Sequence, residues 1–587
     1  MSIKTTAHTF HIPVMGLAFT VDSPIKVAQY GISSVVSIVD DVLIEKMNEF
    51  YSQKFKLPFQ SFPTKELDSR ARRITSYLNN MDIIVKNKFQ EFKEALVEKK
   101  EVLNDYLEML PDFSEIKTNL IHLIEENASK DTLQKWIQEN LTPGEIDVNI
   151  MTKLDGQNYH KKELLGTEHN DAHAALRGFA KSNLSSSIVL SAGMNPRLYS
   201  YFEEFEDFYP NENDELKKKI ILKVSDYRSA TIQGQFFAKK GLWVSEYRIE
   251  SGLNCGGHAF ATEGLLLGPI LNAFQTNKES LVESTYQTYA KALEAKGKHV
   301  PEKPLDVNIT VQGGVGTSEE HQFLLDTYNV SSVGWGSPFL LVPEATTVDN
   351  DTLNVLAKAK EEDLYLSNIS PLGVPFNSVK GVSNDTYKLW KLENDKIGSA
   401  CPKKFLALNQ DSNGKSICTA SQKYQSAEIE KLKEEELSSE AYQSKFDKIT
   451  EKSCLCIGLA NAGLIEKNID SKDTKAGVLV CPGPNIAYFD KEVSLKNMVQ
   501  HIYGKTNVMD AKERPHMFVK ELDMYVKYFN EKLESFLAAP DKKQEKYLTK
   551  FKNNLNEGIN YYRDLFKENN ENLILKVNTL NSEMNSL

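Results

Sequence analysis

Three β-branched segments of this chain each run directly into a glycine-rich turn. The turns are Gly252–Phe260 (GLNCGGHAF), Val311–Gly316 (VQGGVG) and Val333–Phe339 (VGWGSPF), and a helix-like segment separates each from the next apolar run. Repetition of strand, loop and helix in this order is typical of a parallel α/β barrel. The pattern therefore predicts an α/β fold, specifically a (β/α)8 TIM barrel.

The rest of the chain supplies the number of strands that such a barrel needs. Eight β-prone segments follow one another in order, at 12–19, 32–39, 147–153, 186–193, 218–226, 243–251, 305–314 and 330–341. Patterns with helical periodicity follow the later ones, most clearly at 280–297 and 318–329. We therefore assign the barrel to residues 1–40 and 142–345.

Three further regions are predicted outside the barrel. Residues 41–141 are charged, leucine-rich and almost free of glycine, which predicts a helical insertion after the second strand. Residues 346–490 form a mixed cap region that contains cysteines, and residues 491–587 form a mostly helical C-terminal region. The insertion is a candidate lid, dimer arm or partner surface, so we expect either a homodimer or an unidentified redox partner.

Composition excludes some classes of function. The formal net charge is 70 − 81 = −11, which argues against a nucleic-acid-binding protein. No run of about 18 apolar residues occurs, so we expect no membrane span and a cytoplasmic location. A small molecule is the expected substrate.

The two late glycine-rich loops have the composition that a phosphate group requires. One carries Gly313-Gly314, and the other carries Gly334-Trp335-Gly336-Ser337. Only glycine lets backbone N–H groups approach an anion this closely, and a helix start adds partial positive charge. The loops therefore predict a site for a phosphorylated ligand.

Three side chains are candidates for chemistry at this end of the barrel. Lys153 and Lys223 follow apolar strands at their carboxyl ends, where barrel enzymes place their active sites. The alternative is that each lysine only extends to the surface. His258 follows Gly256 and Gly257 on a loop, so its ring can approach a ligand. The alternative is that it only forms a hydrogen bond within the loop.

Five of the six cysteines fall within one C-terminal stretch: Cys401, Cys418, Cys454, Cys456 and Cys481. Such clustering suggests a zinc site or an iron–sulfur cluster, because reduced thiolates bind soft metals. There is no CxxC pair and the intervening loops are long, so buried structural cysteines are the competing interpretation.

The chain resembles the nitronate monooxygenase (2-nitropropane dioxygenase-like) family of FMN-dependent TIM barrels, especially its larger, enoyl-reductase-like members. The resemblance lies in IPVMG near the start, GGH after the sixth strand, GG after the seventh, and GxGSxFL followed by EA after the eighth. It covers about residues 10–40 and 145–345. The Leu-Asn-Cys before GGH, the insertion and the region after 345 depart from the smaller members.

The resemblance implies an FMN-dependent oxidoreductase that acts on a small or acyl-chain organic substrate. His258 matches the position of the family's catalytic histidine, and Lys223 would point toward the flavin. The remaining residues that the resemblance implies in cofactor binding are Met15 and Gly16 against the ring, Gly256 and Gly257 in the GGH loop, and Gly313, Gly314, Gly334, Trp335, Gly336 and Ser337 around the phosphate. The alternative function is a non-flavin TIM-barrel isomerase or lyase acting on a phosphorylated substrate, with Lys153 or Lys223 as a Schiff base.

Overall fold

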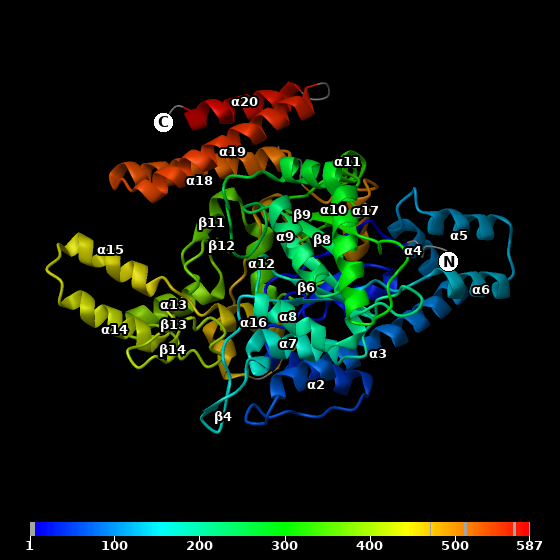
Figure 1. Cartoon of the computed structure of the whole chain (residues 1–587), viewed down its shortest axis with the longest axis horizontal. Coiled ribbons are helices and arrows are strands. Elements are labelled where there is room, and N and C mark those ends of the chain that lie inside the picture. Colours follow the sequence, from blue (N-terminus) through cyan, green and yellow to red (C-terminus); the bar gives the residue numbers. More distant parts are fainter. Residues whose placement is uncertain (1–5, 470, 510–513, 568–570, 586–587) are drawn as a thin grey trace.

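The computed structural model describes residues 6–469, 471–509, 514–567 and 571–585. Its centre is a closed barrel of parallel strands in the spatial order β1-β10-β9-β8-β7-β6-β3-β2, which confirms the predicted (β/α)8 fold (Figure 1). The barrel strands are β1 (Phe10–Ile12), β2 (Ser33–Ser37), β3 (Ile146–Ile150), β6 (Ser186–Leu190), β7 (Lys218–Val224), β8 (Val244–Glu250), β9 (Asn308–Gln312) and β10 (Ser332–Gly334).

The first and last strands are shorter than the sequence suggests. β1 ends at Ile12 because Pro13 follows it and has no N–H to donate to the strand ladder. Residues 13–19, expected in the strand, therefore form the loop above it. β10 ends at Gly334, and the apolar residues up to Leu341 form a short 3₁₀ helix, Ser337–Leu341. In both places apolar residues that were expected to extend a strand instead pack the segment that follows it.

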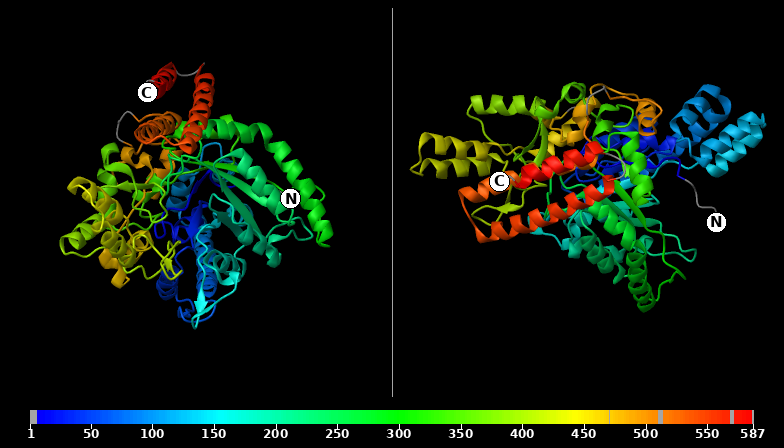
Figure 2. Two further views of the ribbon diagram at one scale, coloured as in Figure 1. Left: turned by 60° about the vertical axis from the view of Figure 1, so that its left-hand side comes forward. Right: turned by 90° about the horizontal axis from the view of Figure 1, so that it is seen from above.

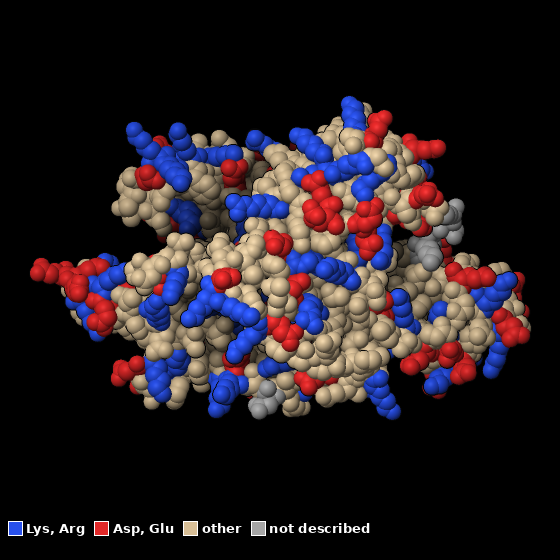
Figure 3. Space-filling view, turned by 60° about the horizontal axis from the view of Figure 1, so that its bottom comes forward, with Lys and Arg blue, Asp and Glu red and all other residues tan. Residues whose placement is uncertain are grey.

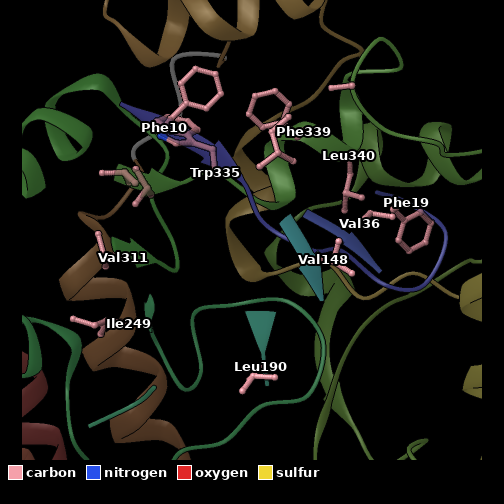
Figure 4. Close-up of a cluster of buried hydrophobic side chains, with 14 of the residues drawn as sticks. Phe10, Phe19, Val36, Val148, Leu190, Ile249, Val311, Trp335, Phe339 and Leu340 are labelled. Atoms are coloured by element: carbon pink, nitrogen blue, oxygen red, sulfur yellow. The ribbon is translucent and has the colours of Figure 1, made fainter. Parts of the chain in front are cut away.

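Side chains alternate along each barrel strand between two environments. One set faces the surrounding helices and is apolar, as Figure 4 shows for Val36, Val148, Leu190, Ile249 and Val311. The other set faces the barrel interior and includes buried ions. Arg248 contacts Asp147 at 3.1 Å and Glu246 at 2.7 Å. The period of two explains why adjacent residues of one strand serve packing and polar functions in turn.

Helices surround the barrel and fill the insertion. Those that follow barrel strands are α1 (Ser23–Val27), α7 (Asp171–Ala180), α8 (Pro196–Tyr201), α9 (Tyr227–Ala238), α10 (Leu267–Ala295) and α11 (Ser318–Tyr328). A two-stranded hairpin, β4 (Tyr159–His160) and β5 (Glu163–Leu164), precedes α7. The insertion after β2 is helical as predicted, with α2 (Asp41–Phe55), α3 (Ser69–Glu98), α4 (Lys100–Met109), α5 (Glu115–Glu125) and α6 (Lys130–Asn140).

The C-terminal extension is mostly helical and packs on the barrel. It contains α12 (Asn350–Lys358), β11 (Leu364–Ser367), β12 (Phe376–Val379), α13 (Ser383–Glu393), β13 (Asn409–Gln410), β14 (Ser416–Ile417), α14 (Gln422–Lys433), α15 (Ser439–Thr450), α16 (Leu455–Glu466), α17 (Leu495–Ile502), α18 (Met517–Ala538), α19 (Lys542–Phe566) and α20 (Glu571–Asn585). Helices α18, α19 and α20 lie together along one side, and the α14–α15 hairpin projects from the molecule (Figure 2). Aromatic rings join the first group, since Phe518 stacks on Tyr562 at 5.0 Å.

The surface carries both signs of charge. On the face shown in Figure 3, basic and acidic side chains are interspersed. No helix in the described part of the chain has the length and apolar character to cross a membrane.

Candidate functional site

The loops that follow β9 and β10 present unused backbone donors at the carboxyl end of the barrel. The N–H groups of Gly313, Gly314, Val315, Gly336 and Ser337 donate to no other residue that the structure describes. Gly313 (φ 128°) and Gly314 (φ 80°) have backbone angles that favour glycine. We call these five residues the amide cup. Buried or half-buried N–H groups need acceptors, and an anion such as a phosphate supplies several at once.

Side chains from the C-terminal extension hold the cup in place. Arg514 donates to the carbonyl of Gly314, and Asn485 donates from Nδ2 to the carbonyl of Val315 at 2.7 Å. The two side chains are joined, since Arg514 Nε donates to Asn485 Oδ1 at 2.8 Å. A buried ion pair of 2.6 Å with Glu320 fixes the guanidinium. The loop carbonyls are thus engaged by the extension, while the amides remain available to a ligand.

The other two residues expected around the phosphate have structural partners. Gly334 is the last residue of β10 and pairs with Gln312 of β9. Trp335 donates its backbone N–H to His11 O at 3.0 Å and its indole N–H to His321 Nδ1 at 3.2 Å. Its side chain is fully buried. These residues support the cup from below and do not contribute free donors to it.

A charged network lies at the carboxyl ends of three neighbouring strands. Lys223 Nζ, near the end of β7, lies 3.1 Å from Glu250 Oε2, at the end of β8. Gln312, at the end of β9, donates to the same carboxylate at 3.0 Å. The ion pair orients the predicted lysine, and the alternation of the strands turns all three side chains to the barrel interior.

His258 is held by the cap region and is not free in solvent. Its Nε2 lies 2.7 Å from Ser370 Oγ, and its ring centroid lies 4.9 Å from that of Phe376 in an edge-to-face arrangement. Burial lowers the pKa of His258 to about 4. The imidazole is therefore neutral at neutral pH, so it carries one ring proton and one acceptor nitrogen.

The GGH loop is also bound through its backbone. The side-chain amide of Asn377 donates to the carbonyls of Cys255 (2.9 Å) and Gly257 (3.1 Å). A Cβ atom at Gly256 would lie 2.5 Å from the carbonyl oxygen of Cys481, so no larger residue fits without movement of the backbone. Both glycines of the motif thus contact the extension at close range.

A short segment of the extension crosses the mouth of the barrel. This strap, residues 480–485, joins the two sets of loops that the sequence singled out. Gly257 N donates to Cys481 O at 3.1 Å, and Gly483 N donates to Ser337 Oγ at 2.7 Å. The strap therefore lies against the GGH loop on one side and the amide cup on the other.

The loop after β1 meets the strap at Cys481. Gly16 has φ +52°, and its N–H, like that of Gly257, acts on the pKa of the Cys481 thiol. Burial raises the pKa of this thiol to about 12. Met15 is half-buried, and its N–H donates to Thr20 Oγ1 at 3.2 Å. Met15 and Gly16 thus lie at the same end of the barrel as the GGH loop.

Lys153 lies on the rim of the mouth. It follows β3, is exposed, and its Nζ lies 6.0 Å from the ring centroid of Phe260. A Cβ atom at Gly193 would come within 2.1 Å of its Cε. Lys153 forms no hydrogen bond or ion pair with any other described residue. The structure therefore gives it less support than it gives Lys223.

The five late cysteines divide into two groups. Cys401 and Cys418 affect each other's pKa, as do Cys454 and Cys456, and the charge of Cys454 acts to raise the pKa of both members of the first pair. Cys481 instead contacts the glycine loops. Among the residues that the structure describes, no three potential ligands are arranged to hold a single metal ion.

Several site residues escaped the sequence analysis. Glu250 could have been identified from the sequence, because it ends the sixth strand on the same face as Glu246 and Arg248. Arg514 and Asn485 had none, because they lie far along the chain from the loops that they hold. Glu521 also had none, although its buried carboxylate accepts from Ser251 at the start of the GGH loop (2.5 Å).

Comparisons with known proteins add little to this geometry. No family model matches the chain, and no curated protein matches it. Among solved structures, the chain is similar to FabK from Thermotoga maritima at 11% identity, covering 64% of this chain and 79% of that chain with a TM-score of 0.30. It is similar to the enoyl reductase domain of MlnA, from the macrolactin biosynthesis cluster of Bacillus amyloliquefaciens, at 14% identity, covering 75% and 88% with a TM-score of 0.33. Likeness at this level carries no argument about function.

Proposed function

We propose that the chain is an FMN-dependent oxidoreductase whose cofactor phosphate binds in the amide cup. The observation that carries the proposal is the set of N–H groups, contributed by the loops after β9 and β10, that have no acceptor among the described residues. A phosphate has enough oxygen atoms to accept from all of them. Arg514, beside Gly314, adds positive charge at the edge of the cup.

The ring of the cofactor would lie over the inner mouth, between the β1 loop, Lys223 and the GGH loop. When bound, FMN supplies the capacity to accept and donate a hydride. Lys223 then offers a positive charge and N–H donors to the edge of the ring that gains negative charge on reduction. Glu250 keeps the lysine side chain oriented through their 3.1 Å contact.

His258 is the proposed acid–base group. Its Nε2 is engaged with Ser370 Oγ, which leaves Nδ1 as the ring nitrogen without a hydrogen-bond partner among the described residues. Burial lowers the pKa of His258 to about 4, so the ring is neutral at neutral pH; with Nε2–H donating to Ser370, Nδ1 would accept a proton from the substrate, which makes the ring a cation until the proton is returned. Ser370 fixes the ring orientation.

The strap and the cap region limit the access of water to the site. The backbone of residues 480–485 packs directly on the GGH loop and on Ser337, and Cys481 is close to both Gly16 and Gly257. Exclusion of water strengthens every electrostatic contact at the mouth. The assignment to a nitronate monooxygenase-like enzyme with a small or acyl-chain substrate depends on the sequence motifs and is part of this proposal.

A phosphorylated substrate in place of FMN would also suit the cup. The Schiff-base version of that alternative needs a lysine that releases its proton readily. Lys223 is held in an ion pair with Glu250, which engages its amine. Lys153 is exposed at the rim, with no general acid or base bonded to it among the described residues. The geometry therefore favours the flavin.

The test is the visible spectrum of the purified full-length chain, followed by heat extraction and chromatography of the released cofactor. We expect the spectrum of an oxidised flavin and FMN at one per chain. A protein that is isolated without flavin, and that shows no spectral change when it is titrated with FMN, would contradict the proposal.

A further inference from the structure

One face of α18 lies against the first residues of the GGH loop. Met517 and Glu521 are one turn apart and both are buried, and Tyr525 continues the same face one turn further on. The carbonyl of Met517 accepts from Asn254 Nδ2 at 3.2 Å, and the carboxylate of Glu521 accepts from Ser251 Oγ at 2.5 Å. The extension therefore holds this loop through two of the loop's own polar side chains.

The same two loop residues lie against the amide cup. A Cβ atom at Gly313 would lie 2.7 Å from Ser251 Cβ, and one at Gly314 would lie 2.0 Å from Asn254 Nδ2. Ser251 N also donates to Gln312 O, directly before the cup, at 3.2 Å, and its hydroxyl oxygen accepts from Asn254 N at 3.1 Å. Ser251 and Asn254 thus set how closely the GGH loop and the amide cup approach each other.

The carboxylate of Glu521 is buried and accepts three hydrogen bonds. Oε1 accepts from Ser251 Oγ, and Oε2 accepts from Leu267 N at 2.9 Å and from Tyr562 Oη at 3.2 Å. Leu267 is the first residue of α10, so the N-terminus of that helix adds partial positive charge. No cationic side chain of the described residues pairs with Glu521. A neutral amide offers only one acceptor oxygen, so the arrangement requires a carboxylate.

We propose that Glu521 is a positioning residue for the cofactor phosphate. Through Ser251 and Asn254 it holds Gly313 and Gly314 in the arrangement in which their N–H groups bind the anion. The proposal rests on the proposed function, because the anion is the phosphate of FMN. Donors bind an anion most strongly when they are already arranged for it, since no reorganisation is then required. The described hydrogen bonds of Glu521 go to other residues, so it acts on the cup through Ser251.

The first experiment separates binding of the phosphate from binding of the flavin ring. Flavin-free wild-type protein, Glu521→Gln, Ser251→Ala and the double variant are titrated with FMN and with riboflavin, and flavin fluorescence is followed. We expect each single variant to bind FMN about 10-fold more weakly, the scale of one charged hydrogen bond, and to bind riboflavin as the wild type does. The double variant should lose no more affinity than the weaker single variant, because both changes break the same connection.

The pH and a control variant make this titration specific. Burial raises the pKa of Glu521 to about 7, so measurements at about pH 8 keep most of the wild-type carboxylate ionised. Glu531→Gln is the matched control, because Glu531 is exposed on the same helix, and it should bind both flavins as the wild type does. An equal loss of FMN and riboflavin affinity in Glu521→Gln, or no loss of either, would overturn the proposal.

Hydrogen exchange of the flavin-free proteins tests the same connection without a ligand. In Glu521→Gln, amide exchange should become faster at residues 251–257 and 312–316 and stay as in the wild type across the helical insertion. Faster exchange throughout the chain would show that Glu521 serves only folding. Ser251→Ala serves for both measurements if Glu521→Gln does not fold. Wild-type protein that binds neither flavin would contradict the proposed function, whereas unchanged exchange in the two loops would contradict the role of Glu521, so the two failures are distinguishable.

Discussion

The barrel loops and the C-terminal extension make different contributions to the same site. The loops provide backbone donors from residues that are adjacent in sequence, such as Gly313 and Gly314. The extension provides side chains that hold those loops, such as Arg514 and Asn485, and a strap that covers them. The comparison teaches that glycine-rich loops alone describe only part of the candidate site, because residues beyond 345 hold those loops.

The largest effect is expected from a change on the barrel side of this comparison. Gly314→Val should weaken FMN binding by about 100-fold or more, since it removes several hydrogen bonds to a charged group. The added Cβ would lie 2.0 Å from Asn254 Nδ2, and the φ of +80° is unfavourable for valine. Flavin fluorescence titration of the purified variant measures the loss.

Gly297→Val is the control for backbone strain alone. Gly297 also has a positive φ, of 63°, but it follows α10 and a Cβ there meets nothing within 4 Å. This variant should bind FMN as the wild type does. If both variants bind equally well, the phosphate does not lie in the amide cup.

The next effect concerns His258, a barrel-loop residue that contacts Ser370 of the extension. His258→Ala should bind FMN nearly normally and lose turnover by about 100-fold, the usual scale for the loss of a general acid or base. Ser370→Ala, which removes the cap contact at Nε2, should lose less, because the ring remains. Steady-state rates of the three proteins on one substrate decide this, and an unchanged rate for His258→Ala would make the histidine a purely structural residue.

On the extension side, Arg514→Gln removes the charged hydrogen bond that holds the carbonyl of Gly314. Loss of one such bond should weaken FMN binding by about 10-fold. The variant also leaves the buried carboxylate of Glu320 without its ion-pair partner, which lowers the free energy of unfolding. The double variant Arg514→Gln/Glu320→Gln should recover stability but not affinity. Recovery of both would show that Arg514 acts only through folding.

Features that depend on local contacts could be predicted from the sequence, and features that depend on distant contacts could not. The (β/α)8 fold, the helical insertion and the position of Lys223 depend on local periodicity, which the chain displays directly. The ends of β1 and β10 were misplaced because apolar residues such as Leu17 and Phe339 pack loops as well as strands. Arg514 and the strap could not be found, because contacts across hundreds of residues leave no local pattern.

The smallest expected effect is the pH dependence that His321, beneath the cup, gives to the free energy of unfolding. His321 is buried, accepts the indole N–H of Trp335, and has a pKa lowered by burial from 6.5 to about 4. Between these values the unfolded chain binds a proton that the folded chain does not, so stability is complete above pH 6.5 and falls as the pH decreases toward 4. The slope from this residue is at most about 1.4 kcal/mol per pH unit.

Urea unfolding across this pH range, in wild type and His321→Gln, measures that slope. The variant should lose the pH dependence that His321 contributes, whereas His122→Gln, on the exposed surface of the insertion, should keep it. Identical slopes in all three proteins would show that His321 does not titrate in this way.

The central claim is that backbone amides of the barrel loops hold a phosphate. Its most direct test is the titration of flavin-free wild-type protein with FMN and with riboflavin, which share the ring and differ in the phosphate. The account predicts that FMN binds at least about 100-fold more tightly, since several hydrogen bonds to a charged group distinguish the two ligands. Equal affinities for FMN and riboflavin would contradict it.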